Sequence, residues 1–155
     1  MTNVTKAELA REVWQQLVGY FFAHRESHLH AAHELGLTPG HMKTLFELDA
    51  EGGRSMGDLA VLLACDASNV TWLVDRLEER GLVERRPHPR DRRVKSVVLT
   101  PEGAKTKALL VERLLTPPED LVGLERTDLD TLRSALTLLP DHPPFWEGEA
   151  EPAAE

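Results

Sequence analysis

The sequence has a single cysteine and no long apolar run, and both shortages exclude classes of protein. Cys65 alone cannot form an internal disulfide or a multi-cysteine zinc site. No stretch approaches the ~20 apolar residues of a membrane-spanning helix. The opening residues, MTNVTKAELAREV, also lack the basic segment and apolar core of a secretion signal. We therefore expect a cytoplasmic protein with no membrane partner.

Enzyme motifs are missing as well. The chain has no glycine-rich phosphate loop, no G-x-S-x-G nucleophile turn and no H-E-x-x-H metal pair. Its histidines, aspartates and serines are not spaced in a way that assembles a catalytic triad. We expect neither an enzymatic activity nor a cofactor.

What the chain does contain suits one globular domain, because its 155 residues are 41% hydrophobic and 28% charged. The most informative segment runs from residue 55 to residue 100. In it, Ser55 and Asp58 have the spacing of a capping box that begins a short helix, and Asp66 caps a second helix that ends at Gly81. Two short helices joined by a tight turn predict a helix-turn-helix.

The second of these helices has one buried and one exposed face. Apolar residues recur along the buried face at helical spacing, at Val70, Leu73, Val74 and Leu77. Small polar side chains near the start of the exposed face suit a DNA major groove. The alternative is an ordinary solvated face, but an exposed tryptophan and the basic segment that follows argue against it. The predicted DNA contacts from this helix are Ser68, Asn69, Thr71, Trp72 and Arg76.

A basic two-stranded ribbon, or wing, is predicted next, with strands at 82–86 and 94–99. From Arg80 to Lys95 there are seven basic and two acidic residues, a net charge of +5. Because the whole chain carries −8, the other residues carry −13. Such segregation of charge favours an edge that binds a polyanion. The predicted DNA contacts from the wing are Arg86, Arg90, Arg92, Arg93 and Lys95.

These motifs carry a family resemblance. The run GDLAVLLACDASNVTWLVDRLEERGLVERR, then Asp91-x-Arg93 and the segment VLTPEG at 98–103, resembles the winged helix-turn-helix of the multiple antibiotic resistance regulator (MarR) family. With the flanking helices, the resemblance covers roughly residues 6–139. It implies a dimer that reads a pseudo-palindromic operator in double-stranded DNA, with Asp91 bracing Arg93. Trp72 departs from the basic or small polar residue common in the family, so a base preference does not carry over.

The fold class predicted is mainly α with a small β-wing, in one domain spanning residues 1–155. Residues 38–100 form the DNA-binding lobe, and segments 5–35 and 101–139 supply dimerisation helices. The first of these is expected to be one continuous helix, whose two apolar strips are too extensive for a single partner and so predict a homodimer. Residues 140–155 are expected to form a mobile acidic tail, with Phe145 and Trp146 available to dock on a neighbouring subunit.

Five histidines fall between positions 24 and 41, and His24 and His28 lie one turn apart on the apolar stripe. Three interpretations stay open. The pair can be core or interface histidines with satisfied hydrogen bonds. With His41, they can line a pocket for an aromatic or anionic effector, as the first helix does in the resembled family. They can also bind a metal ion, with His41 or Glu34 as a further ligand.

Together these observations predict a dimeric, sequence-specific transcriptional regulator of bacterial type, a repressor released by a small-molecule effector. Two alternatives remain. One is a winged-helix module that binds a protein partner, for which the overall charge of −8 is the main argument. The other is a metal-responsive regulator that uses the His24 and His28 region.

Overall fold

The computed structural model describes residues 4–88, 91–142 and 144–145, without the side chains of Ser27 and His28. Three sequence predictions therefore fall outside the described residues: Arg90, the side chain of His28, and the tail from Trp146 onward. In chain order the described elements are α1 (Lys6–Ala23), α2 (Arg25–Glu34), α3 (Pro39–Phe46), β1 (Arg54–Ser55), α4 (Met56–Leu63), α5 (Ala67–Glu79), β2 (Val83–Pro87), β3 (Lys95–Leu99), α6 (Pro101–Leu114), α7 (Glu119–Val122) and α8 (Arg126–Leu136).

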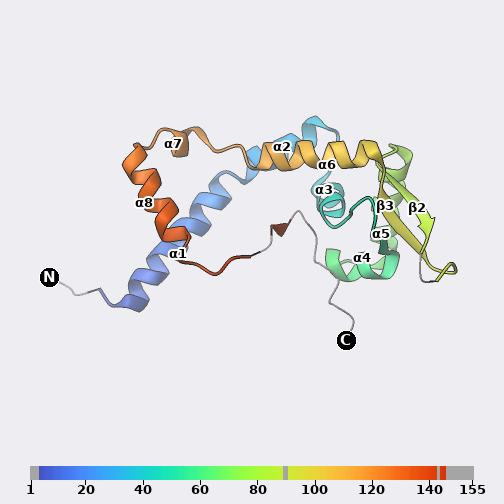
Figure 1. Ribbon diagram of the computed structural model, residues 1–155, viewed down its shortest axis with the longest axis horizontal. Coiled ribbons are helices and arrows are strands. Elements are labelled where there is room, and N and C mark those ends of the chain that lie inside the picture. Colours follow the sequence, from blue (N-terminus) through green and yellow to red (C-terminus); the bar gives the residue numbers. More distant parts are fainter. Residues whose placement is uncertain (1–3, 89–90, 143, 146–155) are drawn as a thin grey trace.

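These elements form a lobe and an arm (Figure 1). The lobe, residues 37–100, contains α3 to α5 and an antiparallel sheet of strand order β1-β3-β2. The arm contains α1, α7 and α8, and α2 and α6 lie against each other between the two parts. The core fills the lobe, where it includes Leu45, Leu48, Leu59, Val70, Val74, Leu77, Val83 and Val97, and Leu110 of α6 completes it. The predicted class, mainly α with a small β-wing, is confirmed.

The predicted helix boundaries in the lobe are confirmed by their caps. Ser55 and Asp58 form a reciprocal capping box at the start of α4, and Asp66 accepts a hydrogen bond from the Asn69 backbone N–H at the start of α5. Gly81, with φ +69°, ends α5 in the left-handed conformation that glycine adopts without strain. One element was missed: the two-residue β1 pairs with β3 and adds an edge to the wing.

The expectation of one continuous helix from residue 5 to 35 is wrong. The chain bends at His24, whose φ of −96° and ψ of 3° separate α1 from α2. The Nδ1 atom of His24 lies 2.9 Å from the Tyr20 carbonyl oxygen. A side chain that enters the i→i−4 hydrogen-bond ladder in this way bends a helix. The bend leaves α1 in the arm and α2 against α6.

The two C-terminal helices do not follow their local sequence patterns. In α6, Ala108 and Leu115, which the apolar spacing suggests as inward residues, are exposed, whereas Gly103 and Leu110 are buried. The close approach of Gly103 to the lobe sets this rotation. In α8, the N-cap is Glu125, so the Thr127-x-x-Asp130 spacing does not form the capping box that it suggests.

Gly103 gives a first prediction. A Cβ atom at this position would stand 1.8 Å from the carbonyl oxygen of Leu82, a backbone atom that cannot move alone. We expect Gly103→Ala to lower the free energy of unfolding by about 1–3 kcal/mol or more, as overpacking does. Chemical denaturation measures this value. The control is Gly19→Ala, because nothing lies within 4 Å of its added Cβ; a similar decrease in the control would contradict the prediction.

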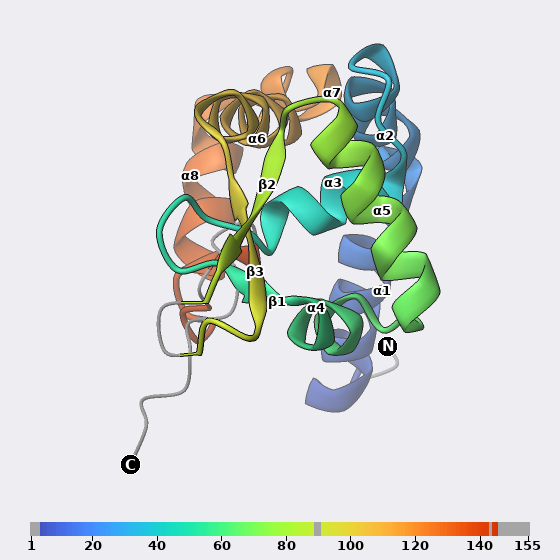
Figure 2. The same ribbon diagram turned by 90° about the vertical axis from the view of Figure 1, so that its right-hand side faces the viewer.

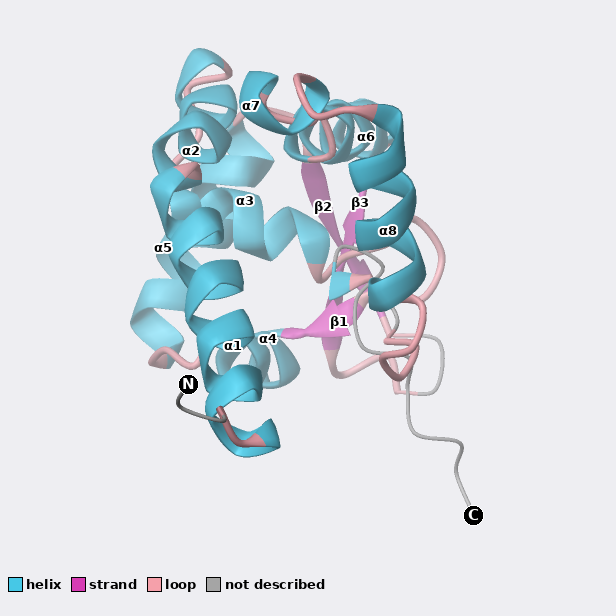
Figure 3. Ribbon diagram, turned by 90° about the vertical axis from the view of Figure 1, so that its left-hand side faces the viewer, coloured by secondary structure: helices cyan, strands magenta, loops and turns pink. Residues whose placement is uncertain are grey.

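The arm has a different character from the lobe, because none of the residues of α1 is buried. Trp14, Phe21 and Phe22 are each more than half exposed, and Leu132 and Leu136 of α8 are also open to solvent. Figure 3 shows the two helices from the arm's side. Among the described residues, no single helix is long and apolar enough to span a membrane; only α4 and α5 taken together reach that threshold, and they are bent by 107°.

Candidate nucleic-acid interface and adjoining cavity

The exposed face of α5 carries the side chains that the sequence analysis selected. Ser68, Asn69, Thr71, Trp72 and Arg76 are all exposed, while Val70, Leu73, Val74 and Leu77 are buried, so the predicted helical phase is confirmed. Figure 2 shows α5 and the β2–β3 ribbon on the same side of the lobe, the side away from the arm in Figure 1. The helix that carries these polar side chains and the basic ribbon thus lie on the same side of the lobe.

Several of these polar groups are held by local hydrogen bonds. The Ser68 hydroxyl donates to the Asp66 carboxylate at 2.6 Å, and this bond, followed by the Asn69 backbone N–H, lowers the pKa of Asp66. The Thr71 hydroxyl donates to the Ala67 carbonyl at 2.8 Å. The Arg76 guanidinium donates to Glu79 at 2.8 Å. The side chains on this face therefore have preferred orientations before any ligand arrives.

Trp72 is supported from below by a residue that the sequence analysis had assigned elsewhere. Trp72 is 48% exposed, and its indole ring stacks on the imidazole of His41, with ring centroids 5.3 Å apart and planes inclined by 19°. His41 itself is buried in the first turn of α3. No sequence signal pointed to this pair, because the two residues lie in different helices.

The arginines of the basic segment divide into structural and exposed groups. Arg80 donates to the carbonyl oxygens of Leu35 at 2.6 Å and Gly36 at 2.8 Å, which closes the end of α2. Arg85 pairs with Asp75 and Glu78 of α5. Arg86 is exposed and pairs with Glu84 on its own strand. The charge available to a ligand is therefore smaller than the sequence count of +5.

The described tip of the wing keeps its positive charge. Arg92, Arg93 and Lys95 are exposed, and none of the three forms an ion pair within the described part of the chain. Asp91 does brace Arg93, but through the backbone: its carboxylate accepts the Arg93 N–H at 2.9 Å. A second bond, from the Val94 N–H to the Asp91 carbonyl, closes the same turn.

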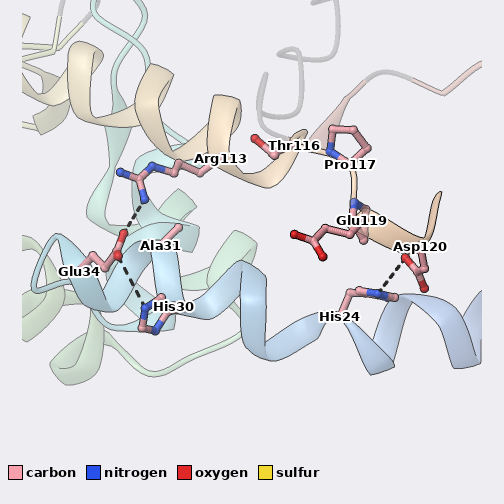
Figure 4. A pocket seen from close by; sticks show the side chains of 10 residues that line it. His24, His30, Ala31, Glu34, Arg113, Thr116, Pro117, Glu119 and Asp120 are labelled. Carbon is pink, nitrogen blue, oxygen red and sulfur yellow. Dashed lines mark hydrogen bonds and ion pairs between the residues drawn. The ribbon is translucent and has the colours of Figure 1, made fainter. Parts of the chain in front are cut away.

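A cavity of about 720 Å³ lies between α2 and the segment that joins α6 to α7 (Figure 4). His24 faces Asp120, with 3.5 Å between Nε2 and Oδ1. On the other side, Glu34 accepts a hydrogen bond from Arg113 at 2.5 Å and lies 3.6 Å from Nε2 of His30. The residues that line it are His24, His30, Ala31, Glu34, Arg113, Thr116, Pro117, Pro118, Glu119 and Asp120.

The structure separates the histidines that the sequence analysis grouped. His24 lines the cavity, His41 is buried beneath Trp72, and the side chain of His28 is outside the described residues. His41 therefore does not join His24 in one site. Across the described ranges, no group of three His, Cys, Asp or Glu residues is placed to hold a metal ion.

The lobe and its flanking helices are similar to known regulators of transcription. The model of the MarR family matches residues 37–95, which is nearly the whole lobe. The chain is 33% identical over 99 residues to the HTH-type transcriptional regulator Mb0904 of Mycobacterium bovis, covering 63% of this chain and 69% of that protein. It is 40% identical over 80 residues to the HTH-type transcriptional regulator YcgE of Bacillus subtilis, covering 52% and 51%. The chain thus spans about half the length of some curated relatives.

A solved structure extends the likeness beyond the lobe. The transcriptional repressor CouR, bound to a 23-mer DNA duplex, is 31% identical, with a TM-score of 0.56 over 88% of this chain and 98% of that one. All three of these relatives are described as regulators or repressors of transcription.

Proposed function

Because the chain belongs to the MarR family, we propose that it is a cytoplasmic, dimeric, sequence-specific DNA-binding repressor of transcription. One observation carries the proposal: α5, with its exposed polar residues, and the arginine-tipped wing lie on the same side of the lobe. In this proposal, α5 enters a major groove, where its first turns contact bases. The wing tip contacts phosphates or enters the adjacent minor groove, whose narrow A·T-rich forms attract arginine.

The test is a salt titration of duplex binding. The probe is the DNA upstream of the protein's own gene, and the comparison is a scrambled duplex of equal length. A repressor should prefer the upstream duplex, with log K falling linearly as log salt rises. Equal weak binding of both duplexes would refute sequence-specific binding.

The arm supports a homodimer. Residues of α1 and α8, among them Val13, Leu17, Leu132 and Leu136, line an open apolar groove of about 1200 Å³. Exposed apolar surface of this extent, continuous over two helices, is typical of a subunit interface. A second copy of the chain is the proposed occupant, because two recognition helices about 34–36 Å apart match a pseudo-palindromic site.

The cavity beside α2 is the proposed effector site, and its charges revise the ligand class suggested by the sequence. Arg113 is already paired with Glu34, and Asp120 faces His24, which leaves Glu119 as a lining carboxylate without an ion pair among the described residues. Tyr20 donates a hydrogen bond to Asp120 at 2.9 Å, and desolvation, followed by this carboxylate, raises the pKa of Tyr20. The lining thus favours a cationic aromatic ligand over an anionic one.

We predict that an aromatic amine such as tyramine releases DNA more effectively than salicylate does. A ligand acts only by preferring one conformation, and a coupling of ~1–3 kcal/mol would weaken DNA binding about 5- to 150-fold. Fluorescence anisotropy of labelled duplex measures the release. Glu119→Gln should abolish the tyramine response, and Glu112→Gln, an exposed position on α6 outside the cavity, is the control. A response to salicylate alone would contradict the cationic assignment.

A further inference from the structure

The imidazole of His41 occupies an unusual position directly under the exposed face of α5. His41 is 6% exposed, and its ring forms the platform on which the Trp72 indole lies. The first turn of α3 approaches α5 closely, because a Cβ atom on Gly40 would stand 2.9 Å from Cδ2 of Leu73. The platform is therefore fixed to the helix that carries Trp72.

The hydrogen bonds of His41 define its tautomer. The backbone N–H of Thr38 donates to Nδ1 at 3.2 Å, so the neutral ring carries its proton on Nε2. The Nε2 atom is buried and has no hydrogen-bond partner within the described residues. Such a group is unfavourable in a core, and an aliphatic residue would avoid it. A histidine at this position makes two contacts at the same time: its Nδ1 accepts the Thr38 N–H, and its ring stacks on the Trp72 indole.

We propose that His41 is a positioning residue for DNA reading, whose ring holds the Trp72 indole in the orientation that meets the groove. The inference rests on the proposed function of α5. An unsupported tryptophan on a helix surface samples several rotamers, and ordering it on binding lowers affinity. The stack orders it beforehand. Its contribution corresponds to a roughly 2- to 10-fold gain in specific affinity.

The charge state of the ring supports this role. Burial, followed by the charges of Arg80 and Arg76, lowers the pKa of His41. The ring is therefore neutral at physiological pH, and Nδ1 remains free to accept the Thr38 N–H. Because the unfolded chain binds this proton at a higher pH than the folded chain does, stability decreases as pH falls below about 6.5 toward the lowered pKa.

Two substitutions separate the two contacts. His41→Gln keeps an acceptor for the Thr38 N–H but removes the ring, whereas His41→Phe keeps a ring for stacking but removes the acceptor. Both are made in a Trp14→Phe, Trp146→Phe background, so that Trp72 is the only tryptophan fluorophore. The measurements are thermal unfolding, time-resolved anisotropy of the indole without DNA, and the ratio of specific to scrambled duplex affinity.

We expect His41→Gln to leave the melting temperature unchanged and to lower the anisotropy of the indole, which becomes mobile. Specific affinity should fall 2- to 10-fold, and binding of the scrambled duplex should not change. His41→Phe should lower the melting temperature yet keep the indole ordered and the affinity ratio intact. The opposite result would overturn the proposal. If His41→Phe lowers the ratio of specific to scrambled duplex affinity and His41→Gln does not, His41 acts only as a helix cap. If the parent protein binds no duplex, the proposed function itself fails, and the indole anisotropy still shows whether the stack orders Trp72.

Discussion

Replacing Arg92 and Arg93 together with alanine should reduce operator affinity on the order of 100-fold. Both side chains are exposed at the wing tip. A hydrogen bond to a charged group is worth about 1.5–3 kcal/mol, and each 1.4 kcal/mol is a factor of ten. The slope of log K against log salt should also flatten by ~0.9 for each phosphate that the variant no longer neutralises. Fluorescence anisotropy over a salt series measures both quantities.

The matched control is Arg126→Ala, because Arg126 is 96% exposed but lies on α8 in the arm, far from the wing. It removes one positive charge without touching the proposed interface. Circular dichroism should show both variants folded, because none of the three arginines is buried. Unchanged affinity and slope in the Arg92, Arg93 double variant would exclude the described wing tip from DNA binding.

Replacing Leu17 and Leu132 together with glutamate should convert the proposed dimer into a monomer. The two residues line the same apolar groove, one on α1 and the other on α8. A stable interface buries roughly 1,200–2,000 Å², and unpaired carboxylates at its centre are strongly unfavourable. Analytical ultracentrifugation at micromolar concentration should show one protomer mass. Operator affinity should fall as well, because the second recognition helix no longer gains from the binding of the first.

Val61→Glu is the control for this experiment. Val61 is 80% exposed on α4, within the lobe, so it tests whether a new surface carboxylate alone disturbs assembly. Neither substitution in the arm removes a buried side chain, and the lobe of the double variant should therefore unfold as in the parent protein. Sedimentation of the double variant as a dimer would rule out the groove as the interface.

The lobe could be predicted closely because its signals are local. Capping residues such as Ser55 and Asp66 act on amides three positions away, and the stripe from Val70 to Leu77 follows from helix geometry. The exposed face of α5 follows from the same periodicity. Charge counting was less accurate, because Arg85 contributes to the basic total and yet is paired with acids of the neighbouring helix.

The features that the sequence did not predict depend on contacts between distant parts of the chain. The bend at His24 involves a backbone carbonyl and Asp120, ninety-six positions later, so apolar spacing alone indicates one uninterrupted helix there. The rotation of α6 depends on one close approach of Gly103 to the Leu82 backbone. Likewise, His41 was expected to be a partner of His24 because the two are near in sequence, whereas the fold stacks His41 on Trp72.

The two hydrogen bonds from Arg80 have a consequence for how the proposed effector site could change its ligand specificity and still act on α5. Arg80 follows α5 directly and binds backbone carbonyls at the end of α2, the helix whose side chains line the cavity. A rigid-body shift of α2 is therefore transmitted to α5 through the Arg80 side chain and the two backbone carbonyls that it binds. These carbonyls are present whatever side chains α2 carries. Substitutions at His30 or Glu34 would thus change the lining of the proposed effector site, while the connection to α5 stays the same.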